Sequence, residues 1–163
     1  MTRRGESVVI VMAEDDPDDI VLTREALEQS RIVNDLHIVE DGVELLAYLR
    51  QEDKYGPESA PRPHLILLDL NMPRKDGRET LTEIKSDPLL RTIPVVVLTT
   101  SNAEEDVWRS YDLGAASYIR KPMTFSGMVE TMTTLGKYWF EIVELPRVPQ
   151  RRSPPPVDAG VAT

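Results

Sequence analysis

Carboxylates follow two apolar runs of this sequence, at positions where burial normally excludes charge. The run 65–68 ends on Asp69, and the run 8–12 is followed closely by Glu14 and Asp15. Because like charges repel and burial penalises every ionised carboxylate, a compensating cation is expected beside them. Mg²⁺ binds oxygen ligands of this kind, typically carboxylates together with water and phosphate oxygens. The residues therefore predict a site for Mg²⁺ and, with it, for a phosphoryl group.

A hydroxyl and an ammonium group end two later apolar runs. Thr99 closes the run that begins at Val95, and its hydroxyl could bond a phosphoryl oxygen. Lys121 precedes Pro122, which favours an extended backbone and would aim the ammonium over the end of the strand. A cis peptide bond would fix this aim more firmly, and the sequence leaves that open. A strand threonine and a surface lysine are the ordinary alternatives, but together with the acids the two form a coherent phosphoryl site.

Asp69 is the candidate phosphoryl acceptor. A carboxylate can attack phosphorus in line, while a metal and a cation offset the charge on the equatorial oxygens. Pro73 and Gly77 constrain the turn that follows Asp69. Such a turn could hold the backbone carbonyl of Asn71 toward a metal bound by Asp15 and Asp69. The alternative is that these acids only cap a helix or a loop.

Strand-like runs alternate with amphipathic helical segments, and these elements must position the polar groups. The runs are mostly continuous and β-branched, as buried parallel strands are. The pattern predicts an α/β fold of the flavodoxin-like, doubly wound kind, with a five-stranded parallel sheet in the order 2-1-3-4-5 and five helices. In that order the first and third strands are neighbours, so Asp15 and Asp69 would meet. The expected strands lie at 8–12, 36–39, 65–68, 95–98 and 117–119.

Helix starts are also readable. Asp16 is a candidate N-cap, Asp41 begins a capping box, and Asn102 is expected to cap the fourth helix. The fifth helix is the longest, and its apolar stripe runs from Phe125 to Trp139. The expected helices run over 17–30, from 42 onward, over 78–86, up to 114, and over 125–140.

Length and composition fit one globular domain. The chain has 163 residues, 40% of them hydrophobic, and its formal net charge of −9 disfavours nucleic acid and anionic membranes as partners. It has no cysteine, which excludes disulfides, thiolate metal sites and a cysteine nucleophile. No signal peptide or membrane span is evident, so a soluble, cytoplasmic protein is expected. We expect a domain over 1–145 with its core at 8–140, a long loop at 51–64, and a proline-rich, disordered tail at 146–163.

In combination these motifs resemble the receiver domain of response regulators in two-component phosphorelays, over about residues 8–140. The resemblance implies that Asp69 is the phosphorylated aspartate and that Lys121 is the lysine facing it. Glu14 and Asp15 match the acidic pair, with Asp15 a direct Mg²⁺ ligand. Asn71 matches the residue whose backbone carbonyl completes the metal shell.

The same resemblance implies a conformational switch. From Asp69 to Thr99 is 30 residues (99−69) and from Thr99 to Lys121 is 22 (121−99), as in chemotaxis-type receivers, which selects Thr99 over Thr100 as the switch hydroxyl. Tyr118, three residues before Lys121, then matches the switch aromatic, with a plain core tyrosine as the alternative.

The proline-bearing loop and the segment 139–146 resemble single-domain regulators that partner phytochrome-like sensor histidine kinases. This implies a phosphoacceptor that catalyses its own phosphorylation and dephosphorylation and is not a substrate-turnover enzyme. It would signal by protein contact or by onward transfer to a downstream phosphotransfer protein. The apolar last helix and the extension after it predict a homodimer, although they could instead close the monomer core.

Two other classes share parts of the pattern. An aspartyl-phosphate-forming hydrolase would carry D-x-D-x-T/V, where this chain has Asn71 and Pro73. A flavin- or nucleotide-binding module on the same fold needs a phosphate cradle after the first strand, where Glu14 and Asp15 would repel a phosphate that came without a metal.

Overall fold

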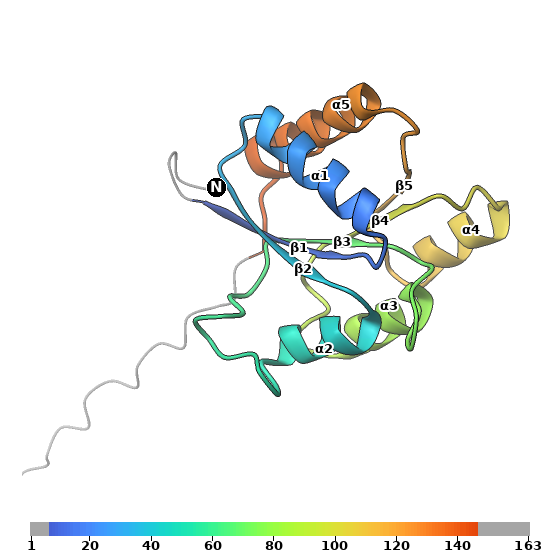
Figure 1. Cartoon of the computed structure of the whole chain (residues 1–163). Helices are drawn as coiled ribbons and strands as arrows, with labels where there is room; N and C mark the ends of the chain where they lie inside the picture. Colours follow the sequence, from blue (N-terminus) through green and yellow to red (C-terminus); the bar gives the residue numbers. More distant parts are fainter. Residues whose placement is uncertain (1–6, 147–163) are drawn as a thin grey trace, which may run out of the picture.

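The computed structural model describes residues 7–146, in which a parallel sheet is covered by helices on both faces (Figure 1). The sheet order is β2-β1-β3-β4-β5, which confirms the predicted fold. Residues 1–6 and 147–163, which include almost all of the predicted tail, lie outside the described residues. The strands are β1 Val8–Ala13, β2 Asn34–Val39, β3 Leu65–Leu68, β4 Val95–Thr99 and β5 Ser117–Arg120. The helices are α1 Pro17–Gln29, α2 Gly42–Arg50, α3 Gly77–Ser86, α4 Glu104–Asp112 and α5 Phe125–Gly136, followed by the π-helical segment η1 Lys137–Ile142.

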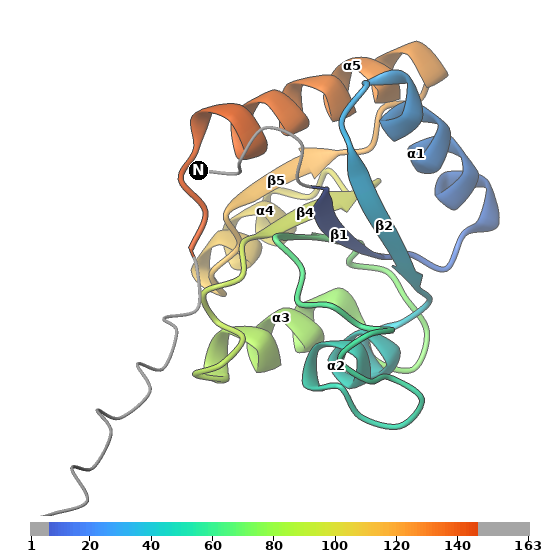
Figure 2. The same ribbon diagram turned by 90° about the vertical axis from the view of Figure 1, so that its left-hand side faces the viewer.

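Strand residues supply two hydrophobic cores, one on each face of the sheet. In β3, Leu65 and Leu67 belong to one core, whereas Ile66 and Leu68 belong to the other. Helices α1 and α5 cover one face of the sheet, and α2 and α3 cover the other (Figure 2). Because the side chains of a strand point alternately to its two faces, four consecutive apolar residues serve both cores. The central strands are therefore sealed on both faces, and polar groups gather where the strands end.

Most helix starts follow the predicted caps, with one exception. Asp16 and Asp41 each accept a hydrogen bond from a backbone N–H in the first turn of α1 and α2. The prediction for the fourth helix is wrong, because Ala103 and not Asn102 precedes α4, and its side chain offers no cap. The first turn of α4 carries the acids of Glu104–Asp106 instead, and their charges favour the positive end of the helix.

The last helix also departs from its prediction. α5 ends at Gly136, and η1 carries the chain on to Ile142. Phe125 is 37% exposed and lies outside the buried stripe, because it occupies the first helical position, where α5 begins beyond the core. Trp139 at the other end of the stripe is buried, as predicted. The segment 51–64 contains neither helix nor strand, which confirms the predicted loop.

Candidate functional site

The carboxyl ends of the central strands bring the predicted site residues to one edge of the sheet. The backbone N–H of Asp69 donates to the carbonyl of Ala13 at 3.1 Å, which fixes the end of β3 beside the end of β1. The backbone N–H of Lys121 donates to the carbonyl of Thr99 at 2.8 Å, which fixes the end of β5 beside the end of β4. The sheet register itself therefore converges these side chains.

Asp69 is 7% exposed, and both of its carboxylate oxygens are engaged. Oδ1 accepts hydrogen bonds from the Thr99 hydroxyl at 2.9 Å and from the backbone N–H of Asn71 at 3.2 Å. Oδ2 accepts a hydrogen bond from the Lys121 ammonium at 3.0 Å. The structure thus brings together Asp69, Thr99 and Lys121, the three residues that the sequence assigns to phosphoryl chemistry.

Lys121 binds three carboxylates at once. Its Nζ lies 2.5 Å from Glu14 Oε2, 2.8 Å from Asp19 Oδ2 and 3.0 Å from Asp69 Oδ2. Burial lowers the pKa of Lys121, but the hydrogen bonds to Asp19 and Glu14 and the charge of Asp69 outweigh burial and raise its pKa above the usual value. The ammonium therefore stays charged at neutral pH.

Asp19 is the contact of Lys121 that sequence reasoning missed. It lies in the first turn of α1, three residues after the N-cap Asp16. Residues three apart share one face of a helix, so an acid there also faces the strand ends that Asp16 follows. That spacing was the available signal.

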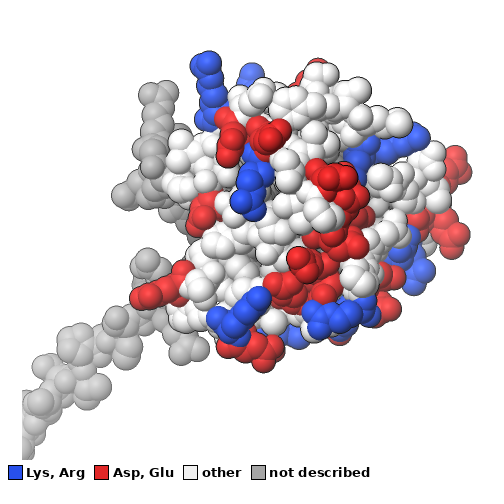
Figure 3. All heavy atoms as spheres, viewed as in Figure 1, with Lys and Arg blue, Asp and Glu red and all other residues white. Residues whose placement is uncertain are grey.

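Glu14, Asp15 and Asp69 form a cluster in which one oxygen of each lies within 4.8 Å of the others. Burial raises the pKa of Glu14 to about 7; the hydrogen bond from Lys121 opposes this shift and the charge of Asp69 adds to it. The cluster holds three carboxylates, and Lys121 brings one ammonium to two of them. Figure 3 shows acidic side chains gathered over the start of α1 on the neighbouring surface. The all-oxygen donor set and its excess of negative charge fit Mg²⁺.

The turn after β3 is as constrained as predicted. The N–H of Gly77 donates to the carbonyl of Leu70 at 2.9 Å, which closes the turn. A Cβ atom on Gly77 would lie 2.2 Å from the carbonyl oxygen of Asp69, so only glycine fits there. Asn71 lies within this turn, and the role of its carbonyl as a metal ligand stays a prediction. The Lys121–Pro122 peptide bond is trans, since no bond in the described chain is cis.

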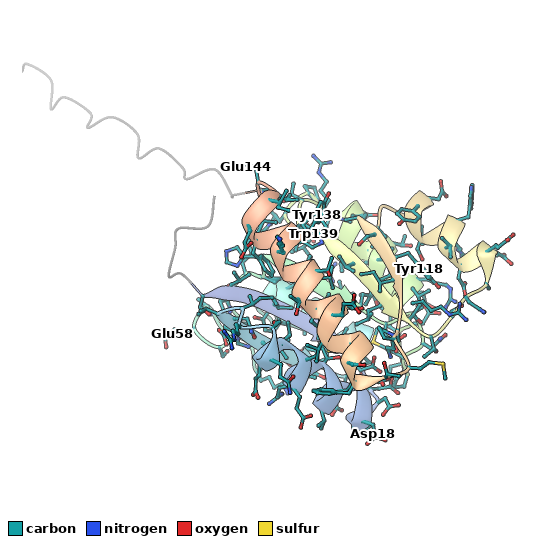
Figure 4. The ribbon with its side chains drawn as sticks, turned by 90° about the horizontal axis from the view of Figure 1, so that it is seen from above. Asp18, Glu58, Tyr118, Tyr138, Trp139 and Glu144 are labelled. Atoms are coloured by element: carbon teal, nitrogen blue, oxygen red, sulfur yellow. The ribbon has the colours of Figure 1, made fainter. Side chains whose placement is uncertain are left out.

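Tyr118 on β5 lies beside the loop that joins β4 to α4 (Figure 4). Its hydroxyl donates to the carbonyl of Ser101 in that loop at 2.8 Å. The Ser101 hydroxyl donates to Asp106 of α4 at 2.6 Å, and Arg78 of α3 donates to the same carboxylate, also at 2.6 Å. The hydrogen bonds from Ser101 and Arg78 hold the pKa of Asp106 below its usual value. Sequence reasoning did not find this network, which ties the loop to α3, α4 and β5.

Comparison with known proteins identifies the family. Residues 10–133 match the response regulator receiver domain. The chain belongs to this family. It is 46% identical over 138 residues to the response regulator Rcp1 of Synechocystis sp., covering 85% of this chain and 92% of that protein. Family membership favours the two-component interpretation over the hydrolase and the flavin- or nucleotide-binding module.

Solved structures agree with this response regulator closely. The phosphorylated cyanobacterial phytochrome response regulator RcpA is 46% identical with a TM-score of 0.81, over 87% of this chain and 100% of that chain. The Mn²⁺-bound form of Rcp1 is 45% identical with a TM-score of 0.78, over 86% and 99% of the two chains. These two relatives have therefore been seen phosphorylated and with a divalent cation, respectively. Within residues 7–146, no helix is long and apolar enough to cross a membrane.

Proposed function

We propose that this response regulator accepts a phosphoryl group on Asp69 from the phosphohistidine of a partner sensor histidine kinase. One observation carries the proposal. The nearly buried carboxylate of Asp69 accepts a hydrogen bond from the Thr99 hydroxyl on one oxygen and from the Lys121 ammonium on the other, and two further acids lie beside it. These two hydrogen-bond donors are therefore close enough to Asp69 to turn to the oxygens of a phosphoryl group attached there and to stabilise its charge.

In the proposed transfer, an Asp69 oxygen attacks the phosphorus in line. The O–P bond forms, the P–N bond to histidine breaks, and the imidazole nitrogen keeps the electron pair. Thr99 and Lys121 turn their hydrogen bonds to phosphoryl oxygens. Attack by water on the phosphorus later restores the carboxylate. Because the chain's own residues assist both steps, the protein is a phosphoacceptor that catalyses its own phosphorylation and dephosphorylation.

Mg²⁺ is the proposed cofactor. Asp15 and Asp69 would bind it through their carboxylates, Asn71 through its backbone carbonyl, and Glu14 would complete the acidic pair. When bound, the ion supplies positive charge that offsets the phosphoryl oxygens. The acidic cluster and the Mn²⁺-bound form of Rcp1 support this assignment.

Thr99 and Tyr118 are the proposed switch. On phosphorylation, Thr99 leaves Asp69 Oδ1 for a phosphoryl oxygen and draws the β4–α4 loop inward. Tyr118 follows, because its hydroxyl already contacts the carbonyl of Ser101 in that loop. Phosphorylation thereby shifts an existing two-state equilibrium and reshapes the face made by α4, β5 and α5.

The relatives suggest the partners. RcpA is a phytochrome response regulator, so a phytochrome-like histidine kinase is the proposed donor in the cytoplasm. Output would be by protein contact or by onward transfer to a downstream phosphotransfer protein, without nucleic acid or membrane. We assign the single receiver domain to residues 1–145, with its core at 8–140, and set the proline-rich segment 146–163 apart from it.

A homodimer through the last helix and the segment after it is also proposed. Tyr138 and Ile142 of η1 are 51% and 65% exposed, while Trp139 between them is buried (Figure 4). Val143 and Leu145 pack on the core of their own chain, so part of this segment also closes the monomer. Sedimentation at equilibrium should show a dimer that Ile142→Lys weakens, and a monomeric wild type would overturn this part of the proposal.

Labelling by acetyl phosphate tests the proposed acceptor. We expect a mass increase of one phosphoryl group with Mg²⁺, loss of labelling with a chelator, and no labelling of Asp69→Asn. Asp112→Asn removes an exposed aspartate at the end of α4 and should label as the wild type does. Metal-independent labelling at full rate, or undiminished labelling of Asp69→Asn, would overturn the assignment. Faster transfer from a phosphorylated phytochrome-type kinase than from an unrelated histidine kinase would support the proposed donor.

A further inference from the structure

We propose that Asp19 is a positioning residue that keeps the Lys121 ammonium at the phosphoryl site throughout the phosphorylation cycle. The inference rests on the proposed function of Asp69. It concerns a carboxylate that lies outside the acidic cluster and, within residues 7–146, touches the site only through Lys121.

The hydrogen bonds of Lys121 are fully used. An ammonium has three hydrogens, and Glu14, Asp19 and Asp69 each accept one. Two of these three acceptors also have another role in the proposed reaction. Asp69 becomes the acyl phosphate, and Glu14 belongs to the cluster that would hold Mg²⁺. Asp19 alone can keep the same hydrogen bond before, during and after phosphoryl transfer.

The position of Asp19 suits a fixed anchor. It lies in the first turn of α1, where the helix dipole favours negative charge, and its side chain is 26% exposed. The Asp16 side chain caps this turn by accepting from the Asp18 N–H at 2.9 Å. The Asp19 carboxylate is therefore held by a capped helix, whereas Lys121 has a flexible four-carbon stem. The contact joins α1 to the end of β5, two elements far apart in the chain.

The expected effect is on the rate of the chemical step. With Asp19 in place, the hydrogen that now points to Asp69 Oδ2 can turn to a phosphoryl oxygen while the ammonium stays where it is. Without Asp19, the lysine loses one of its anchors, and the ammonium spends more time with Glu14. The phosphoryl group then meets a less well-placed cation, although the metal ligands are unchanged.

The test compares Asp19→Ala with Asp18→Ala in the full chain. Asp18 is an exposed acid in the same helical turn, so its removal costs the same helix-dipole interaction without touching Lys121. At saturating acetyl phosphate and Mg²⁺, we expect the maximal labelling rate of Asp19→Ala to fall about tenfold, the effect of one charge-assisted hydrogen bond. Asp18→Ala should label at the wild-type rate. Titration calorimetry should give Mg²⁺ dissociation constants that differ by less than about twofold between the two variants, which corresponds to a small change in binding free energy.

Asp19→Asn keeps the shape and an acceptor oxygen while losing the charge, and it should fall between the wild type and Asp19→Ala. It carries the test if Asp19→Ala fails to fold. Equal maximal rates for the Asp19 and Asp18 variants would overturn the inference. So would a loss explained by weaker Mg²⁺ binding, since Asp19 would then belong to the metal site. A wild type that never labels on Asp69 would refute the proposed function and the inference together, whereas normal labelling with no Asp19 effect refutes the inference alone.

Discussion

Two polar clusters lie at the same edge of the sheet, and their charges are balanced in opposite ways. In the Lys121 cluster, one ammonium faces the carboxylates of Glu14, Asp19 and Asp69. In the Asp106 cluster, one carboxylate accepts hydrogen bonds from the guanidinium of Arg78 and from a hydroxyl. The Lys121 cluster holds more carboxylates than cations. In the Asp106 cluster one carboxylate is paired with one guanidinium, so its charges are matched.

The difference separates a ligand site from a structural contact. Excess buried acid destabilises a protein until a cation arrives. Burial is the main cause of the raised pKa of Glu14, and the charge of Asp69 adds to it. A matched cluster stabilises the fold without any ligand, and the lowered pKa of Asp106 records that balance. The two clusters should therefore respond differently to the loss of one group, and Mg²⁺ should offset the loss only in the Lys121 cluster.

The largest effect is expected from Lys121→Met in metal-free buffer. Glu14 and Asp69, 1% and 7% exposed, would be left as buried carboxylates without their cation. Removing one partner of a buried ion pair costs about 3–5 kcal/mol, and urea unfolding should show a loss of that size. Mg²⁺ should recover a large part of the loss, because it brings positive charge to the same carboxylates.

Lys85→Met is the matched control for this change. Lys85 is also partly buried, but its ammonium donates to the backbone carbonyls of Arg91 and Ile93 and to no carboxylate among the residues that the structure describes. Its removal should cost about 1.5–3 kcal/mol, the range for hydrogen bonds of a charged group, and Mg²⁺ should not alter that cost. A Lys121 variant that behaves like the Lys85 variant would show that the acid excess has no energetic consequence.

The pH dependence of stability tests Glu14 directly. Its pKa of about 7 in the folded protein lies above its ordinary value of 4.5, so the folded state favours the protonated form. Protonated Glu14 therefore stabilises the folded state fully below about pH 4.5, and this stabilisation is lost as the pH rises through 7. The shift corresponds to about 3 kcal/mol, and Glu14→Gln in metal-free buffer should not show that loss.

Glu25→Gln, which changes an exposed acid of α1, should keep the wild-type pH dependence. The comparison is made by urea unfolding at pH 5 and pH 8 with a chelator present. Parallel stability curves for the wild type and Glu14→Gln would contradict the assignment of excess acid to this cluster.

The sequence predicts the Lys121 cluster far better than the Asp106 cluster, for a physical reason. Asp69 and Thr99 stand at the ends of buried strands and Lys121 follows the edge strand β5, and the order of a parallel sheet decides which strand ends are neighbours. A polar residue at the carboxyl end of such a strand must lie at that edge of the sheet. The site and the order of the strands could therefore be read from apolar runs and the residues that close them.

Contacts that depend on how helices turn and where loops run could not be read in this way. Arg78 and Asp106 meet because α3 and α4 present particular faces to each other, and no local pattern sets that rotation. The prediction of Asn102 as a helix cap was wrong because Asn and Ser are common in loops as well as at helix starts, so the residue type does not fix where the helix begins. Asp19 is the intermediate case, because its spacing from Asp16 indicated the face but not the partner.

Asp106→Asn should have a smaller effect than the changes at the Lys121 cluster. The amide keeps one acceptor oxygen for Arg78 or Ser101 but loses the charge, at a cost of about 1.5 kcal/mol. The loss should be the same with and without Mg²⁺, measured by urea unfolding at pH 7. The difference from the wild type should be full above the ordinary pKa of aspartate and should disappear only as the pH falls through the lowered pKa of Asp106, because the stability that a lowered pKa contributes is lost over that range. A Mg²⁺-dependent loss would place Asp106 in the ligand site after all.

Tyr118→Phe should have the smallest effect on stability, about 1 kcal/mol, because it removes only the hydrogen bond to the Ser101 carbonyl and keeps the ring. Since Asp106 accepts a hydrogen bond from the hydroxyl of the same Ser101, the two contacts restrain one residue of the loop. A double-mutant cycle with Asp106→Asn should therefore give a coupling energy of at least about 0.5 kcal/mol. Additive effects would mean that Tyr118 and the Asp106 cluster hold separate parts of the loop. In that case Tyr118 could follow Thr99 without disturbing the matched cluster.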